Sequence, residues 1–181
     1  MNILETPRLY LRKMNETDLP DLAEILQDEI AMTAYEHAFS DEEVRQWLDK
    51  QLLRYRENGF GLWAVVLKST GEMVGQCGIT MQPLHDKMVP EIGYLFKRKH
   101  WHNGYAAEAA IACRGYAFET LGIDEICSII RDTNTASINV AKRNGMQPVD
   151  RFVKHYYGVD MPHVVYSVRR DDLPLVSPTQ S

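Results

Sequence analysis

Apolar residues recur along the chain with the two spacings typical of strands and helices. Strand-like runs lie at 8–14, 61–68, 73–81, 89–96, 124–131, 146–156 and 161–170. Helical spacing predicts four helices: one beginning at residue 18 with Thr17 as its cap, one after the capping box Ser40–Glu43, one over 104–121, and one that Asn134 caps and that runs through Arg143.

The resulting order, β-α-α-β-β-β-α-β-α-β-β, predicts an α/β (α+β) domain with helices on both faces of a mixed sheet. Turns are expected at 69–72 and 157–160, and a longer polar loop at 82–87. No repeat or flexible linker divides the chain, so we expect a single domain over 1–170. The segment 171–181 carries two prolines and is expected to form a poorly ordered tail.

Composition narrows the classes of partner. The chain has 181 residues, of which 25 are acidic and 20 basic, for a net charge of -5. This balance argues against a broad nucleic-acid-binding face and weakly favours a cationic or amine-bearing partner. Trp47 and Trp63 are expected in the core.

The cysteines and the apolar runs indicate in which cellular compartment the protein works. Cys77, Cys113 and Cys127 lie in apolar contexts without metal-ligand or CxxC spacing, which predicts buried thiols in a reducing environment. The longest apolar run, 62–67, is far below the roughly 20 residues of a membrane helix, and the N-terminus carries no signal-peptide pattern. We therefore expect a soluble, cytoplasmic protein without a membrane partner.

The segment 90–110 carries the clearest chemical information. A strand leads through a basic turn directly into a long helix, whose first amides are unpaired and carry the positive end of the helix dipole. Gly104 allows close approach of a ligand, and Lys97, Arg98 and Lys99 precede it. This combination predicts a phosphate site. The alternative is a solvated turn in which Gly104 only fits a bend; the nucleotide P-loop pattern is absent.

Four motifs follow one another along the chain. They are ETPRLYLR at 5–12, EIGY at 91–94 followed by GYAAEA at 104–109, the Asn-x-x-Ser-x-x-x-Ala-x-x-x-Gly block from Asn134, and the closing hairpin at 158–170. In this order they resemble the GNAT acetyltransferase superfamily, in the branch that contains the ribosomal-protein N-terminal acetyltransferases. The resemblance covers nearly all of 3–170. It implies the GNAT fold, with a mixed sheet of about seven strands that separates between the fourth and the fifth.

The resemblance also implies acetyl-CoA, held in the cleft between these two strands. The residues expected to pair with the pantetheine arm are Tyr94, Leu95 and Phe96, with Asn134 on the other side. Those expected to offer amides to the phosphates are His102, Asn103, Gly104, Tyr105 and Ala106. Two positions depart from the family pattern. His102 stands where glycine is usual, and Ala141 stands where many members have a tyrosine that protonates the leaving thiolate.

The implied reaction is acyl transfer to a neutral amine, which needs a base. Glu91 is the first candidate; the alternative is a strand carboxylate that is exposed or paired with a neighbouring base. Ser137 could offer its hydroxyl to the thiolate, or only assist helix capping.

The loops expected to border the acceptor pocket carry Tyr35, Glu36, His37 and His85. The remaining histidines lack metal-ligand spacing, so no metal is predicted.

The sequence thus predicts an acetyl-CoA-dependent N-acetyltransferase acting on a primary amine, either a protein N-terminus or a small molecule. A CoA-binding module of the same fold with little or no turnover is the alternative, and an unrelated α/β nucleotide-binding protein is a weaker one. Monomer and homodimer both stay open.

Overall fold

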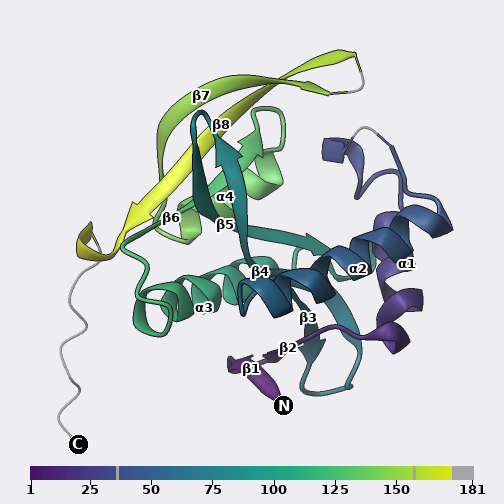
Figure 1. Ribbon diagram of the computed structural model, residues 1–181. Coiled ribbons are helices and arrows are strands. Elements are labelled where there is room, and N and C mark those ends of the chain that lie inside the picture. The colour runs from purple at the N-terminus through teal and green to yellow at the C-terminus, as the bar shows by residue number, and fades with distance from the viewer. Residues whose placement is uncertain (36, 157, 173–181) are drawn as a thin grey trace, which may run out of the picture.

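Eight strands form one mixed sheet in the computed structural model, which describes residues 1–35, 37–156 and 158–172 (Figure 1). The spatial order is β1-β2-β3-β4-β5-β6-β8-β7. The strands are β1 (Asn2–Glu5), β2 (Leu9–Arg12), β3 (Leu62–Leu67), β4 (Met73–Leu84), β5 (Lys87–Phe96), β6 (Glu125–Arg131), β7 (Gln147–Tyr156) and β8 (Val159–Arg169). Neighbours are antiparallel except β5 and β6, which are parallel. The predicted class is confirmed, and β1 is the strand that the sequence pattern missed.

Helices cover both faces of this sheet, as predicted. They are α1 (Leu19–Leu26), α2 (Asp41–Glu57), α3 (Tyr105–Glu119) and α4 (Thr135–Arg143). Alternate residues of β3 point to opposite faces. Leu62, Ala64 and Val66 join the core under α1 and α2, whereas Trp63 and Val65 join the core with α3 and α4.

Side-chain caps fix where the helices begin. Ser40 accepts from the Glu43 amide and the Glu43 side chain accepts from the Ser40 amide, which confirms the capping box of α2. Asn134 caps α4, also as predicted. The predicted cap of the first helix is wrong. Asn15, not Thr17, accepts the hydrogen bond, from the Thr17 amide, and begins a short 3-10 helix ahead of α1.

The sheet separates between β5 and β6, which are the fourth and fifth predicted strands. β5 pairs with β4 along its whole length, but with β6 only at Glu91 and Cys127. Side chains bridge the strands where the ladder stops. The Ser128 hydroxyl donates to the Ile92 carbonyl at 2.9 Å, and the Glu91 carboxylate accepts from the Ile129 amide at 3.0 Å. The predicted opening of the sheet is confirmed at this point.

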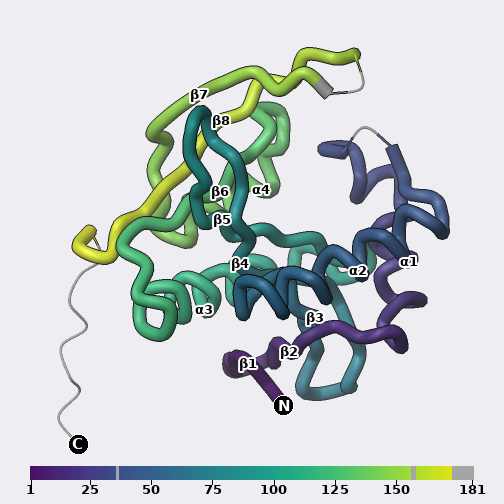
Figure 2. Tube along the Cα trace, viewed as in Figure 1, coloured from purple at the N-terminus to yellow at the C-terminus, as the bar shows by residue number. Residues whose placement is uncertain are grey.

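The predicted loop at 82–87 is wrong. β4 and β5 stay paired as far as Leu84 and Lys87, so the turn contains only His85 and Asp86. His85 adopts a left-handed φ of 53°. In Figure 2 this hairpin extends away from α2 and α3 toward the long β7–β8 hairpin. Polar residues on such an arm remain exposed, and their composition therefore looks like that of a loop.

The core contains the expected residues. Trp63 is fully buried, and all three cysteines are buried without a disulfide. Trp47 is only partly buried and donates its indole N–H to Gln76 Oε1 at 2.9 Å. No helix among the described residues is long and apolar enough to cross a membrane. Of the predicted tail, residues 171 and 172 close a short 3-10 helix, η4 (Arg170–Asp172), and 173–181 lie outside the described residues.

Candidate active site

A cavity of about 720 Å³ lies where β5 and β6 separate. Its walls are the end of β5, the first turn of α3, one face of α4, and residues 30–34 after α1. All but two of the predicted site residues line it: Tyr94, Leu95, Phe96, His102, Gly104, Tyr105, Ala106, Asn134 and Ser137. The two that do not are Glu91 and Asn103.

Free backbone amides form one wall of this cavity. Within the described residues, the N–H groups of 102–107 have no hydrogen-bond acceptor, and the first helical bond runs from the Glu108 amide to the Gly104 carbonyl. His102 and Gly104 both adopt left-handed conformations, with φ of 64° and 79°. This conformation costs a residue other than glycine about 1–2 kcal/mol, so the fold holds His102 in a shape suited to glycine. Consecutive amides in such a turn form a concave anion site.

Two side chains hold the turn in shape by hydrogen bonds to backbone carbonyls. The Asn103 amide group donates to the carbonyls of His100 and Trp101, both at 3.1 Å. The Trp101 indole donates to the Phe96 carbonyl at 2.9 Å and so fixes the turn to the end of β5. Asn103 therefore shapes the turn and does not face the cavity with its side chain.

The basic run does not contribute to the cavity, and this part of the phosphate prediction is wrong. None of Lys97, Arg98 and Lys99 lines it. Their partners are Asp21 and Glu24 for Lys97, at 2.6 Å each, Asp28 for Arg98, at 2.9 Å, and Glu24 and Glu72 for Lys99, at 3.0 and 2.8 Å. These charges are neutralised by Asp21 and Glu24 on α1, by Asp28 just after it, and by Glu72. The anion site therefore depends on the backbone amides, and the arginines that do line the cavity are Arg131 and Arg143.

The opposite wall is built by α4. The Asn134 side chain accepts from the Ser137 amide at 3.1 Å, so Asn134 performs the capping that the sequence left open for Ser137. The Tyr94 hydroxyl donates to the Ser137 carbonyl at 2.9 Å and ties β5 to α4 across the gap. Burial raises the pKa of Tyr94 well above its ordinary value. Ala141 is buried and offers no proton donor.

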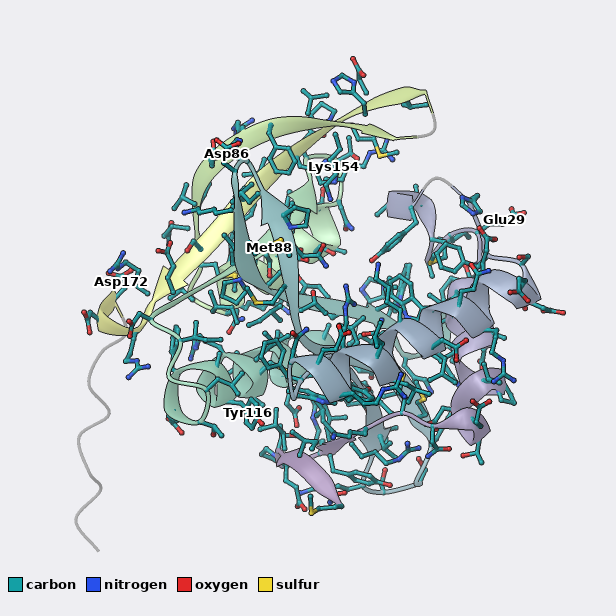
Figure 3. All side chains as sticks on the ribbon, viewed as in Figure 1. Glu29, Asp86, Met88, Tyr116, Lys154 and Asp172 are labelled. Atoms are coloured by element: carbon teal, nitrogen blue, oxygen red, sulfur yellow. The ribbon has the colours of Figure 1, made fainter. Side chains whose placement is uncertain are left out.

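Glu91 lies at the point where β5 and β6 part, just beyond the cavity wall. Burial raises the pKa of its carboxyl to about 7, against the opposing effects of the Ile129 amide and of the charges on Lys154 and Arg54. In Figure 3 Lys154 lies beside the inner side of the β7–β8 hairpin. The hydrogen bond to this carboxylate comes from the Ile129 backbone amide and not from a neighbouring base. The role of Glu91 as the catalytic base stays a prediction, which a pKa near neutrality supports.

Residues 30–34 form a wall of the cavity that the sequence did not predict. Ile30, Ala31, Thr33 and Ala34 line it, and the Arg131 guanidinium donates to the Thr33 carbonyl at 3.2 Å. This bond joins β6 to the segment between α1 and α2. Small and apolar side chains without a motif gave no signal for this wall.

The predicted acceptor-side residues are not brought to the cavity. His37 pairs with Glu43 at 2.9 Å, and His85 pairs with Asp150 at 2.6 Å at the far end of the β4–β5 hairpin. Tyr35 packs against aromatic rings of Phe39 and Trp47, and Glu36 lies outside the described residues. No group of three metal-ligating side chains occurs among the described residues.

Comparisons of the sequence and of the structure with known proteins point to the same family. The model of the acetyltransferase (GNAT) domain matches residues 8–147. YkkB of Bacillus subtilis (strain 168) is 40% identical over 144 residues, covering 79% of this chain and 84% of YkkB. An acetyltransferase from Agrobacterium tumefaciens is 30% identical, with a TM-score of 0.78 over 92% of this chain and 94% of that one. The ribosomal-protein acetyltransferase RimL, crystallised with coenzyme A, shares the fold at 19% identity, with a TM-score of 0.78 over 96% of this chain and 100% of its own. The chain therefore belongs to the GNAT acetyltransferase family and is an acetyl-CoA-dependent acyltransferase.

Proposed function

We propose that this protein is an N-acetyltransferase that moves the acetyl group of acetyl-CoA to a primary amine, on a protein N-terminus or a small molecule. One observation carries the proposal: the cavity combines the free amides of 102–107 with the unpaired edge of β5. A diphosphate needs the first of these features, and a chain of amide groups such as pantetheine needs the second. RimL, which has this fold, binds coenzyme A.

The edge of β5 suits the pantetheine arm. The Ile92 carbonyl faces β6, where it accepts from Ser128. Backbone groups alternate in direction along a strand, so those of Tyr94 face the same side two residues later. β6 has diverged there, and no register partner for Tyr94 exists on that side among the described strands. Tyr94 would therefore offer its N–H and C=O to the arm, with Asn134 on the opposite wall.

Acetyl-CoA supplies an activated acyl group and a thiolate leaving group. In the proposed mechanism Glu91 removes a proton from the acceptor amine. Because Glu91 is not part of the cavity wall, it acts through a water molecule. A pKa of about 7 leaves much of the carboxylate ionised at neutral pH, ready to accept the proton. The amine nitrogen forms a bond to the thioester carbonyl carbon, and the carbon–sulfur bond breaks to release the CoA thiolate. Ser137, which lines the cavity, stabilises this thiolate with a hydrogen bond from its hydroxyl, and solvent supplies the proton because Ala141 leaves no tyrosine to do so.

A CoA-binding module with little or no turnover is the second candidate. The absence of an acid at Ala141 favours it, since the leaving thiolate would then depend on Ser137 or solvent.

Thermal melting followed by a thiol-release assay separates these candidates. We expect acetyl-CoA and CoA, but not ATP, to raise the melting temperature. Thiol release should then depend on an added amine in a panel of peptides with free N-termini, amino acids and polyamines. A thermal shift without thiol release on any amine would favour the binding module. No shift with either CoA compound would refute the proposed site.

A further inference from the structure

Arg8, just before β2, reaches across to the turn that begins α3. Its guanidinium donates from Nη1 to the Asn103 carbonyl at 3.0 Å and from Nε to Glu108 Oε2 at 2.6 Å. It also lies over the Tyr105 ring, 4.6 Å from the ring centre. One side chain therefore contacts three residues of this turn, from a position about 100 residues earlier in the chain.

The contact with Asn103 fixes the direction of a peptide plane. In a trans peptide the carbonyl of one residue and the N–H of the next point in opposite directions. No peptide bond in the described residues is cis. Since the Asn103 carbonyl is held toward Arg8, the Gly104 N–H points away from Arg8. Gly104 itself lines the cavity. Arg8 thus holds the turn in the orientation that presents an amide to the ligand.

The contact with Glu108 balances a charge. Glu108 lies in the first turn of α3, close to the amides proposed to hold the diphosphate. Its side chain is mostly buried and accepts from Thr6, from the Arg8 amide and from the Arg8 guanidinium. These bonds, together with the Arg8 charge, lower the pKa of Glu108 despite its burial and keep it ionised. Without the guanidinium, this negative charge would repel a nearby phosphate.

We propose that Arg8 is a positioning residue for acetyl-CoA, which orients the 102–107 amides and offsets Glu108 beside the diphosphate without contacting the acyl group. This proposal rests on the proposed function. It assigns a cofactor-binding role to the N-terminal segment, which lines no part of the cavity.

Calorimetry with CoA tests the proposal without relying on turnover. We expect Arg8→Gln to weaken CoA binding by about tenfold, the effect of losing a charged hydrogen bond. Arg8→Lys, which keeps the charge, should recover part of this loss. Arg45→Gln is the matched control, because Arg45 is also exposed and paired with a carboxylate, Glu16, outside the cavity. It should bind CoA as the wild type does.

Kinetics with two acyl donors show whether Arg8 acts through the diphosphate of acetyl-CoA. S-acetyl-pantetheine lacks the diphosphate, so Arg8→Gln should reduce kcat/KM for acetyl-CoA and leave it unchanged for S-acetyl-pantetheine, with kcat at saturating acetyl-CoA unchanged. Equal losses with both donors would overturn the proposal, as would unchanged CoA binding.

A second variant, Glu108→Gln, keeps Arg8 and removes the negative charge. If Glu108→Gln weakened CoA binding as much as Arg8→Gln does, the bonds that Glu108 accepts would be responsible, and not the guanidinium of Arg8 itself. The proposal would then be wrong. If wild-type protein did not bind CoA, the proposed function would fail instead.

Discussion

Glu91→Gln should lower turnover at pH 7 by about 100-fold, the usual contribution of a general base. Glutamine keeps the oxygen that accepts from the Ile129 amide but cannot take a proton. In the wild type, kcat/KM should rise with pH and level off above about 7, where the carboxylate is ionised. The variant should lack this inflection. Steady-state thiol release between pH 5.5 and 9 measures both effects.

The same substitution, which lowers turnover, should raise the stability of the fold above neutral pH. The folded protein holds the Glu91 proton up to about pH 7, whereas an ordinary glutamate loses it near 4.5. Stability therefore falls as pH rises through this window, and the loss persists above it. Glu91→Gln removes the loss and should raise the free energy of unfolding at pH 8 by about 1–3 kcal/mol. Glu119→Gln, at the exposed end of α3, serves as the control and should alter neither property. Unchanged turnover in Glu91→Gln across this pH range would remove Glu91 as the base.

Gly78→Ala should destabilise the fold by about 3 kcal/mol or more, because an added Cβ cannot be accommodated. That atom would lie 2.0 Å from the Gly61 carbonyl oxygen and 2.8 Å from Leu62 Cα. Both obstacles are backbone, and the Gly61 carbonyl already accepts from the Ile79 amide at 3.2 Å. Strands β3 and β4 would have to move apart at the centre of the sheet. Thermal melting should show a fall of roughly 6–12 °C.

Gly93→Ala is the matched control, because Gly93 is the register partner of Gly78 on β5. A Cβ there would meet only Leu62 Cδ2, at the ordinary contact distance of 3.5 Å. We expect a change of less than about 1 kcal/mol. Equal destabilisation by the two substitutions would show that glycine itself, and not the approach of β3, matters in these strands.

Local patterns predicted most of the fold. The capping box at Ser40 and the cap at Asn134 locate two helices because each is a short-range hydrogen bond between neighbours in sequence. β1 was missed because it is only four residues long with exposed polar ends. The β4–β5 hairpin was interrupted too early because the residues around its turn are mostly polar and exposed. Leu84 is buried there against Cys127 and Val165, but a single apolar residue shows no alternation in the sequence.

In the candidate site, too, the features set by neighbouring residues could be predicted, and those set by long-range contacts could not. The amides of 102–107 follow from a strand, a turn and a helix that are contiguous in sequence, so they could be predicted. The partners of Lys97, Arg98 and Lys99 could not, because the carboxylates on α1 and just after it lie some 70 residues away and become neighbours only through folding. The wall at 30–34 and the hold of Arg8 on Asn103 depend on the same kind of long-range contact.

The central claim is that the amides of 102–107 hold the diphosphate of acetyl-CoA. Amide NMR spectra of labelled protein, titrated with CoA and separately with pantetheine, test it most directly. The account predicts that CoA shifts the amide signals of Gly104, Tyr105 and Ala106 strongly, whereas pantetheine leaves them in place and shifts Tyr94. Signals of 102–107 that do not respond to CoA while others do would contradict the account.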